Sequence, residues 1–247
     1  MDSVLLFRTD RVGDFLLSLS LIRIIKINYP NSNITVVASE KNQKYVRSFK
    51  EVNDVIVLKN SLLSKISLIF KLREKKYDAV IVHDGKNRSR FVSFFLKYQK
   101  KVLCFTNLID SQIEIIQKTC RELNVPYNID CLNFMDNREY QKQYIPFNNY
   151  IQLHLDEKWT YDEYIKKYVN IEPSSEELIH FINRIISKNK NIIITTGKIK
   201  TKLLNNIKDK IDINKVQILE NQDLPELENI VFNSSLLITC HGWISHI

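Results

Sequence analysis

A carboxylate directly after a glycine is the first feature of this sequence that suggests chemistry. The 247 residues include four glycines, and Gly13 precedes Asp14 in the stretch TDRVGDFL, between an apolar run and a helical pattern. An aspartate at the start of a helix is favoured as a cap of the helix N-terminus. The same carboxylate, held on a strand-to-helix loop, could take a proton from a reacting hydroxyl as a general base. The residues leave both interpretations of Asp14 open.

Basic side chains accompany this carboxylate and a second loop. Arg8 and Arg11 flank the first loop, and the stretch HDGKNRSR places Lys86 and Arg88 just after Asp84. Guanidinium and ammonium groups bind anions such as phosphate. Solvated loop charges would give the same sequence, so anion binding is one of two interpretations for these residues.

Two further loops with polar residues follow predicted strands in the second half of the chain. They contain Thr196, Gly197, His241, Gly242, Ser245 and His246. In open α/β sheets, ligands bind outside the carboxyl ends of the strands, and a helix N-terminus at that edge binds phosphate. We therefore expect these loops to face a ligand, with a structural turn as the alternative.

Apolar runs of strand length alternate with helical patterns, and these elements must position the loops. The predicted strands are Ser3–Phe7, Asn33–Ser39, Asp54–Leu58, Tyr77–Asp84, Lys101–Phe105, Tyr150–Leu155, Asn191–Thr196, Val216–Leu219 and Ser235–Cys240. Helical segments such as Asp14–Ile27 and Leu62–Lys76 separate them. Strands rich in Val and Ile between helices predict an α/β fold whose parallel sheets are covered on both faces.

The strand and helix rhythm fades between residues 125 and 149, where Pro126 and Pro146 stand among several Asn residues. Such a stretch is typical of a connection between domains. We predict two domains, at residues 1–145 and 146–247. Because the second has fewer strands and the chain stops where a helix should begin, we expect this domain to be incomplete.

The charge of the chain favours anionic partners. It has 36 Lys and Arg against 28 Asp and Glu, a formal net charge of +8. Nucleic acid is one such partner, but the chain lacks RNP, KH and zinc-finger signatures, and we expect no nucleic-acid binding. Four cysteines without metal-ligand spacing predict free thiols in a reducing compartment. With no secretory leader and no membrane-spanning run, the expected location is the cytoplasm or the cytoplasmic face of the inner membrane, as a peripheral protein.

Three stretches, in this order, resemble glycosyltransferase family 9, the heptosyltransferases of lipopolysaccharide core synthesis. The opening, LLFRTDRVGDFLLSLSLIRIIKINYPNSNITVVAS, is similar to the strand, Gly-Asp loop and apolar helix that begin those proteins. YDAVIVHDGKNRSRFVSFFLKYQKKVLCF resembles their mid-domain strand, loop and helix. DLPELENIVFNSSLLITCHGWISH is similar to their C-terminal donor motif. The resemblance covers most of the chain and is weakest over residues 125–149.

The resemblance implies a GT-B fold, with two Rossmann-like domains facing a cleft. It implies inverting transfer without a metal or other cofactor, from a nucleotide-diphosphate sugar such as ADP-heptose to an anionic glycolipid or glycan. Asp14 would be the general base. The acceptor would bind at Arg8, Arg11, Gly13, Asp84, Lys86 and Arg88. The donor would bind at Lys158, Thr196, Gly197, His241, Gly242, Ser245 and His246.

The donor loop departs from the family pattern, because His241 stands where an aspartate is usual, and the family continues well beyond residue 247. We therefore keep a non-catalytic nucleotide-sugar-binding module as the alternative function. The stretch RFVSFFLKYQKK also has two interpretations. It could contact anionic lipid at the inner membrane, or it could bury a stripe of phenylalanines in the core, which is the interpretation we favour.

Overall fold

The computed structural model describes residues 1–104, 111–132, 145, 147–155, 173–197, 202–239 and 243–246. The chain forms two compact units, Met1–Asp136 and Asn137–Ile247, as the sequence analysis expected of an α/β protein with two domains. The division lies nine residues before the predicted boundary at 145–146. Each unit is described by itself.

Unit 1 is built on a five-stranded parallel sheet. Its strands are β1 (Ser3–Arg8), β2 (Asn33–Ala38), β3 (Asp54–Val57), β4 (Lys76–Val82) and β5 (Lys97–Leu103). They pair in the order β3-β2-β1-β4-β5, and all four ladders are parallel. The central strand β1 is apolar and buried over almost its whole length, as expected of a strand covered by helices on both faces.

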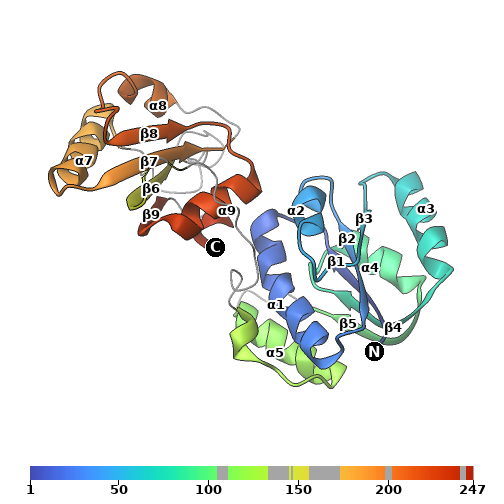
Figure 1. Ribbon diagram of the computed structural model, residues 1–247. Coiled ribbons are helices and arrows are strands. Elements are labelled where there is room, and N and C mark those ends of the chain that lie inside the picture. The colour runs from blue at the N-terminus through green and yellow to red at the C-terminus, as the bar shows by residue number, and fades with distance from the viewer. Residues whose placement is uncertain are drawn as a thin grey trace. The chain divides into compact units, whose positions relative to one another are not determined.

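Helices cover both faces of this sheet (Figure 1). They are α1 (Val12–Asn28), α2 (Gln43–Arg47), α3 (Leu62–Arg73), α4 (Asn87–Phe94) and α5 (Gln112–Leu123), followed by the 3-10 helix η1 (Ile129–Leu132). Helix α1 contacts α2 and α5 on one face, and α3 contacts α4 on the other. The helix predicted at Asp14–Ile27 is therefore confirmed, with a start two residues earlier.

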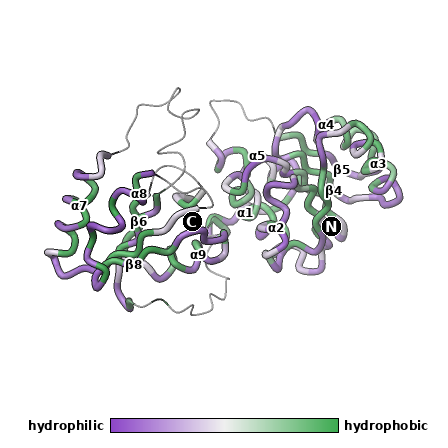
Figure 2. Tube along the Cα trace, turned by 90° about the horizontal axis from the view of Figure 1, so that it is seen from above, coloured by the Kyte–Doolittle hydropathy of each residue, from purple (hydrophilic) through white to green (hydrophobic). Residues whose placement is uncertain are grey.

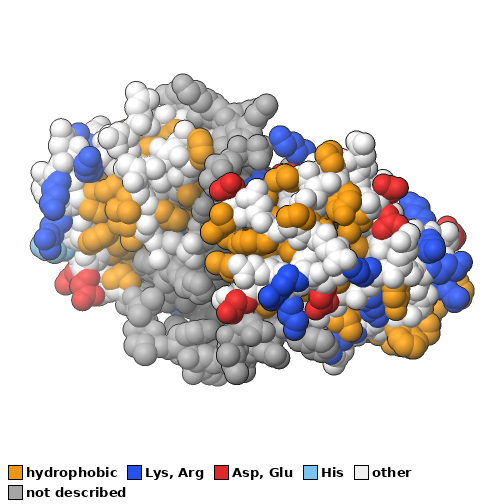
Figure 3. Space-filling model, turned by 90° about the horizontal axis from the view of Figure 1, so that it is seen from below, with side chains coloured by type: hydrophobic (Ala, Val, Ile, Leu, Met, Phe, Trp, Pro, Cys, Tyr) orange, Lys and Arg blue, Asp and Glu red, His pale blue; other side chains and the backbone are white. Residues whose placement is uncertain are grey.

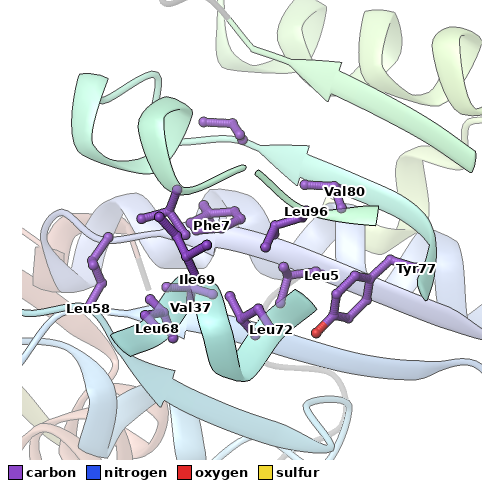
Figure 4. Close-up of a cluster of buried hydrophobic side chains, with 12 residues drawn as sticks. Leu5, Phe7, Val37, Leu58, Leu68, Ile69, Leu72, Tyr77, Val80 and Leu96 are labelled. Atoms are coloured by element: carbon purple, nitrogen blue, oxygen red, sulfur yellow. The ribbon is translucent and has the colours of Figure 1, made fainter. Parts of the chain in front are cut away.

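The core under α3 and α4 is formed by side chains from both helices and from the sheet (Figure 4). Leu5 and Phe7 of β1 and Val80 of β4 meet Leu68 and Leu72 of α3. Burying an aliphatic or aromatic side chain of this size contributes roughly 1.5–3 kcal/mol. These contacts hold α3 and α4 on the sheet.

The phenylalanine stripe of RFVSFFLKYQKK does not lie in the core, which corrects our preferred interpretation. Helix α4 begins at Asn87, ends at Phe94 and buries Val92 and Ser93, while Phe91, Phe94 and Phe95 are exposed. Strand β5 begins soon afterwards, at Lys97, because pairing with β4 extends it toward the N-terminus. The small residues of α4 face the sheet, so the large aromatic residues point away from it.

Unit 2 repeats the design with four parallel strands. They are β6 (Tyr150–Leu155), β7 (Asn191–Thr196), β8 (Val216–Leu219) and β9 (Leu236–Thr239), in the order β8-β7-β6-β9. Its helices are α7 (Ser175–Ser187), α8 (Lys202–Ile207), α9 (Leu224–Asn233) and the 3-10 turn η3 (Trp243–His246). Capping boxes start α7 and α9, as the Ser and Asp residues before them indicate. The strands are mostly hydrophobic in Figure 2.

The helix expected after HGWISH is a single 3-10 turn in the described part of the chain. Strand β9 lies at the edge of its sheet, and Leu236 is exposed there. None of the helices in the described residues is both long enough and apolar enough to cross a bilayer.

Candidate functional site

The sheet of unit 1 brings two of the predicted loops together. Strands β1 and β4 are neighbours, and the strand order reverses between them, since β2 and β3 follow on one side and β5 on the other. Crevices at such a reversal, outside the carboxyl ends of the strands, are where ligands bind in open α/β sheets. The loops after Arg8 and after Val82 begin at this point.

Asp84 ties these two loops to each other. Its Oδ2 accepts hydrogen bonds from the backbone N–H of Thr9 (3.0 Å), the Thr9 hydroxyl (2.6 Å) and the Ser89 hydroxyl (2.7 Å). Its Oδ1 accepts the backbone N–H of Lys86 at 3.0 Å. With its carboxylate buried and four donors bound, Asp84 organises the site from inside the protein rather than presenting a free surface to a ligand.

Arg8 has a similar internal position, with 3% of its surface exposed. Its Nε donates to the carbonyl oxygen of Asp14 (2.7 Å) and its Nη1 to that of His83 (2.7 Å). The Asn42 side chain donates in turn to the Arg8 carbonyl at 2.9 Å. The guanidinium thus fixes the end of β1 against the first turn of α1 and the end of β4.

Asp10 is the titratable residue that the sequence analysis missed. Its Oδ1 lies 3.4 Å from Arg8 Nε, is inaccessible to solvent and has no hydrogen-bond partner among the described residues. Burial raises the pKa of this carboxyl to about 6. The charge of Arg8 opposes this rise, and the charges of Asp14 and Asp84 add to it. A raised pKa beside other charges is typical of functional sites. In the sequence, the one signal that could have pointed to Asp10 was its position as a second acidic residue, four residues before Asp14.

Asp14 is the third residue of α1, and Arg11 is the N-cap. The Asp14 Oδ2 accepts the backbone N–H of Arg11 at 3.3 Å, a long hydrogen bond that leaves the other carboxylate oxygen for a further partner. The side chain of Asp14 is partly exposed, and Arg11 is exposed next to it. Gly13 is buried within the first helical turn, so its place reflects close packing there.

Arg88 and Lys86 complete the second loop. Arg88 donates from Nε to the Thr9 hydroxyl (2.9 Å) and from Nη2 to the Thr9 carbonyl, which makes it a further clamp between the loops. Lys86 is exposed at the N-cap of α4. Gly85 has φ of 60°, a left-handed conformation that glycine adopts without strain.

A buried histidine lies beneath this cluster. His83 Nδ1 is 2.7 Å from the Ser18 hydroxyl of α1, and its Nε2 has no partner in the described structure. Burial, with a smaller effect of the Arg8 charge, holds the pKa of His83 well below its ordinary value. His83 is therefore neutral at pH 7 and contributes hydrogen bonding rather than charge.

Unit 2 also has a reversal of strand order, between β6 and β9. Thr196 is buried at the end of β7, where its Oγ1 accepts the backbone N–H of Asn221 at 3.3 Å. Beyond it, no described atom lies within 4 Å of the position that a Cβ on Gly197 would occupy. Ser245 is exposed in η3. Lys158, His241 and Gly242 lie outside the described residues, as does the side chain of His246.

The described residues contain no group of three or more His, Cys, Asp or Glu side chains placed to hold a metal ion. The described polar cluster of unit 1 is instead formed by carboxylates, guanidinium groups and hydroxyls. These groups can take up a proton and bind an anion.

The comparisons with known proteins now bear on this geometry. No protein-family model and no curated protein matches the sequence. The fold matches solved structures. The E. coli heptosyltransferase WaaC with ADP-2-deoxy-2-fluoro heptose superposes with a TM-score of 0.72 at 14% identity, over 99% of this chain and 84% of that one. This chain has the same fold as that protein.

A second structure of this fold is equally similar. It is the glycosyl transferase family 9 protein of Veillonella parvula, with a TM-score of 0.72, 14% identity and coverage of 99% and 76% of the two chains. The UDP-N-acetylglucosamine 2-epimerase of Listeria monocytogenes, at 12% identity and coverage of 98% and 75%, has a TM-score of 0.56. The GT-B architecture expected from the resemblance is therefore confirmed.

Proposed function

We propose that this protein is a glycosyltransferase of the heptosyltransferase type. It transfers a sugar, heptose or a similar one, from a nucleotide-diphosphate sugar such as ADP-heptose to an anionic glycan or glycolipid of the lipopolysaccharide core. The observation that carries the proposal is the Gly13–Asp14 pair in the first turn of α1, at the reversal of strand order in a chain that shares its fold with heptosyltransferases.

Asp14 is the proposed general base. Its carboxylate is partly exposed at the carboxyl edge of the sheet, and a rigid helix carries it. It takes the proton of the acceptor hydroxyl as that oxygen attacks the anomeric carbon of the donor. Attack opposite the departing nucleotide inverts the configuration at that carbon.

Cations of unit 1 serve the acceptor in two ways. Arg11 lies next to the base and Lys86 lies in the loop after β4; both are exposed and bind the anionic groups of the acceptor. Arg8, Asp84 and Arg88 act through other residues, because their polar groups hold the two loops in register. The latter three are positioning residues, and their loss would move Asp14 and Thr9.

The donor is assigned to unit 2. In the sequence, Lys158 follows β6, Thr196 and Gly197 stand at the end of β7, and His241 to His246 follow β9. Lys158 and the backbone after Gly242 would neutralise the departing diphosphate. Charge stabilisation of this kind lets a transferase act without a metal, and we include metal-independent transfer in the proposal.

The proposed acceptor also indicates where in the cell the reaction takes place. A glycolipid of the lipopolysaccharide core is made at the inner membrane, so we place the protein at the cytoplasmic face of that membrane. The free thiols of Cys104, Cys120 and Cys131 suit a reducing compartment.

Replacing the base gives the sharpest test. Asp14→Asn keeps an oxygen that can accept the Arg11 N–H, so the fold should survive, while transfer from ADP-heptose falls by about 10²–10⁴-fold. Asp209→Asn, at an exposed aspartate of unit 2, is the matched control. The configuration of the product at the anomeric carbon, measured by NMR, tests inversion, and activity in EDTA tests independence from metal. Unchanged turnover of Asp14→Asn would remove Asp14 as the base.

One observation favours the alternative of a binding module without catalysis. Asp14 accepts the Arg11 N–H, so its place is also explained by helix capping. Calorimetry with ADP-heptose and UDP-N-acetylglucosamine, run beside transfer and hydrolysis assays, separates the two functions. Binding without turnover of either kind would support the module.

A further inference from the structure

Helices α3 and α4 expose large apolar side chains on the sides that face away from the core. Those of α3 are Leu62, Leu63, Ile66 and Phe70, and those at α4 are Phe91, Phe94 and Phe95. We call these seven residues the α3–α4 surface. Leu63 is 80% exposed and Phe94 73%, so they are not residues at the rim of the core. Scattered exposed apolar residues are ordinary, whereas a set of this size on two neighbouring helices needs a partner.

The residues on α3 form one stripe. At 100° per residue, Leu62, Ile66, Phe70 and Leu63 fall within about 100° of the helix surface. The buried residues Leu68, Ile69 and Leu72 occupy the adjoining sector and pack on the sheet. The outward stripe is thus separate from the core contact, and the fold does not need it.

The aromatic residues at α4 contact one another. Phe95 meets Phe91 with ring centroids 5.3 Å apart and Phe94 with centroids 5.2 Å apart, both in edge-to-face geometry. Val92 and Ser89, on the opposite side of this helix, are buried. Three exposed rings held in this way form a preformed hydrophobic projection.

The charge around these helices identifies the occupant. Between Lys59 and Lys101 the sequence has twelve Lys and Arg and three Asp and Glu, a formal net charge of +9, whereas the whole chain has +8. Lys59, Lys71, Lys75 and Lys97 are exposed. Figure 3 shows hydrophobic side chains next to Lys and Arg, with some Asp and Glu among them, at the right end of unit 1, where Figure 1 places α3. Apolar side chains among lysines suit an anionic lipid surface, which offers phosphate to the cations and acyl chains to the rings.

We propose that the α3–α4 surface docks unit 1 onto an anionic membrane. Its apolar side chains insert at the boundary between head groups and acyl chains, and the surrounding lysines bind lipid phosphates. This inference deepens the proposed function and rests on it only for the choice of a bacterial inner membrane as the surface.

Co-sedimentation of the full chain with vesicles tests the proposal. Vesicles of phosphatidylethanolamine and phosphatidylglycerol should bind the protein, whereas vesicles of phosphatidylcholine alone should not, and salt should weaken binding by screening. The double variant Leu63→Ser/Phe94→Ser should lower the partition coefficient by about tenfold or more, because each side chain loses its apolar burial. The pair Lys71→Glu/Lys75→Glu should lower it on phosphatidylglycerol vesicles in particular.

Matched controls lie on unit 2. Ile213→Ser/Phe232→Ser removes two exposed apolar side chains there, and Lys208→Glu/Lys210→Glu reverses two exposed lysines. Both should leave vesicle binding unchanged. Equal binding by the unit 1 and unit 2 variants, or no binding by the native chain, would overturn the proposal.

Two further measurements separate other outcomes. A dimer in sedimentation velocity that Leu63→Ser/Phe94→Ser dissociates would overturn the proposal in favour of a second copy as the occupant. Transfer to a water-soluble acceptor saccharide should be the same in this variant as in the native chain. Vesicle binding without any transfer would refute the proposed function and leave the docking surface standing.

Discussion

Asp10→Asn should stabilise the protein at neutral pH and impair its function. The Asp10 carboxyl has a pKa of about 6 in the folded chain and an ordinary value of 3.8. That difference, at about 1.4 kcal/mol for each pKa unit, corresponds to about 3 kcal/mol that the folded state loses when Asp10 ionises. Asparagine resembles the protonated acid in size and has no charge to bury. The variant should therefore be more stable than the native chain by up to about 3 kcal/mol at pH 8.

The stability difference between Asp10→Asn and the native chain should grow as the pH rises. Below pH 4, Asp10 is protonated in both folded and unfolded chains, and the variant should gain little. Between about pH 4 and 6 the folded chain holds a proton that the unfolded chain has released, so the native stability falls as the pH rises. Above pH 6 the gain of the variant should reach its plateau.

Urea unfolding of the native chain and of Asp10→Asn at pH 4, 6 and 8 measures this difference directly. Transfer assays over the same range should show an inflection near pH 6 that the variant lacks, because the charge of Asp10 acts on Arg8 and through it on the position of Asp14. Asp209→Asn serves as the control for an exposed carboxylate. A stability difference that is constant with pH would refute the assignment of a buried, strained charge to Asp10.

Three further predictions concern residues around the same cluster. Below about pH 6.5 the unfolded chain protonates His83 while the folded chain keeps it neutral, so the native stability should fall as the pH drops below 6.5. In urea titrations, the stability of His83→Gln should depend less on pH in this range. Asp84→Asn should lower the free energy of unfolding by about 2–3 kcal/mol in the same titrations, because the NH₂ group of the new amide would face N–H and O–H groups that now donate to the carboxylate. The control Asp130→Asn should change this free energy little. Burial raises the pKa of the Cys104 and Cys120 thiols to about 11, so iodoacetamide at pH 7.5 should modify them in mass spectra only after denaturation. Ready labelling of the native chain would contradict that burial.

Local patterns predicted most of the fold because the strands and long helices have strong periodicity of their own. The apolar run before Arg8 and the pattern from Asp14 to Ile27 became β1 and α1 with small changes at the ends. The segment from Phe91 to Tyr98 was assigned wrongly. Its aromatic residues favour burial, but small side chains of α4 took the inward side, and pairing with β4 drew Lys97 and Tyr98 into a strand.

The site was less accessible to prediction, because its properties come from residues far apart in the chain. Gly13 and Asp14 could be picked out by type and spacing. The raised pKa of Asp10 depends mainly on burial, with a smaller contribution from Asp84 in the loop after β4. Likewise Arg8 and Asp84 were predicted to bind the acceptor, and their hydrogen bonds show that they connect the loops. Only the pairing of β1 with β4 brings these groups together.

Helix α4 connects the two proposals for unit 1. At its start Arg88 and Ser89 bond to Thr9 and Asp84 of the site, and at its end Phe94 projects from the α3–α4 surface. Ser89 and Phe94 are five residues apart, which is about 8 Å along a helix. An acceptor whose lipid enters the membrane at Phe94 would therefore have its first sugars near Thr9 and Asp84, which the start of α4 contacts. The short length of α4 thus matches a reaction on the part of a glycolipid that lies close to the bilayer.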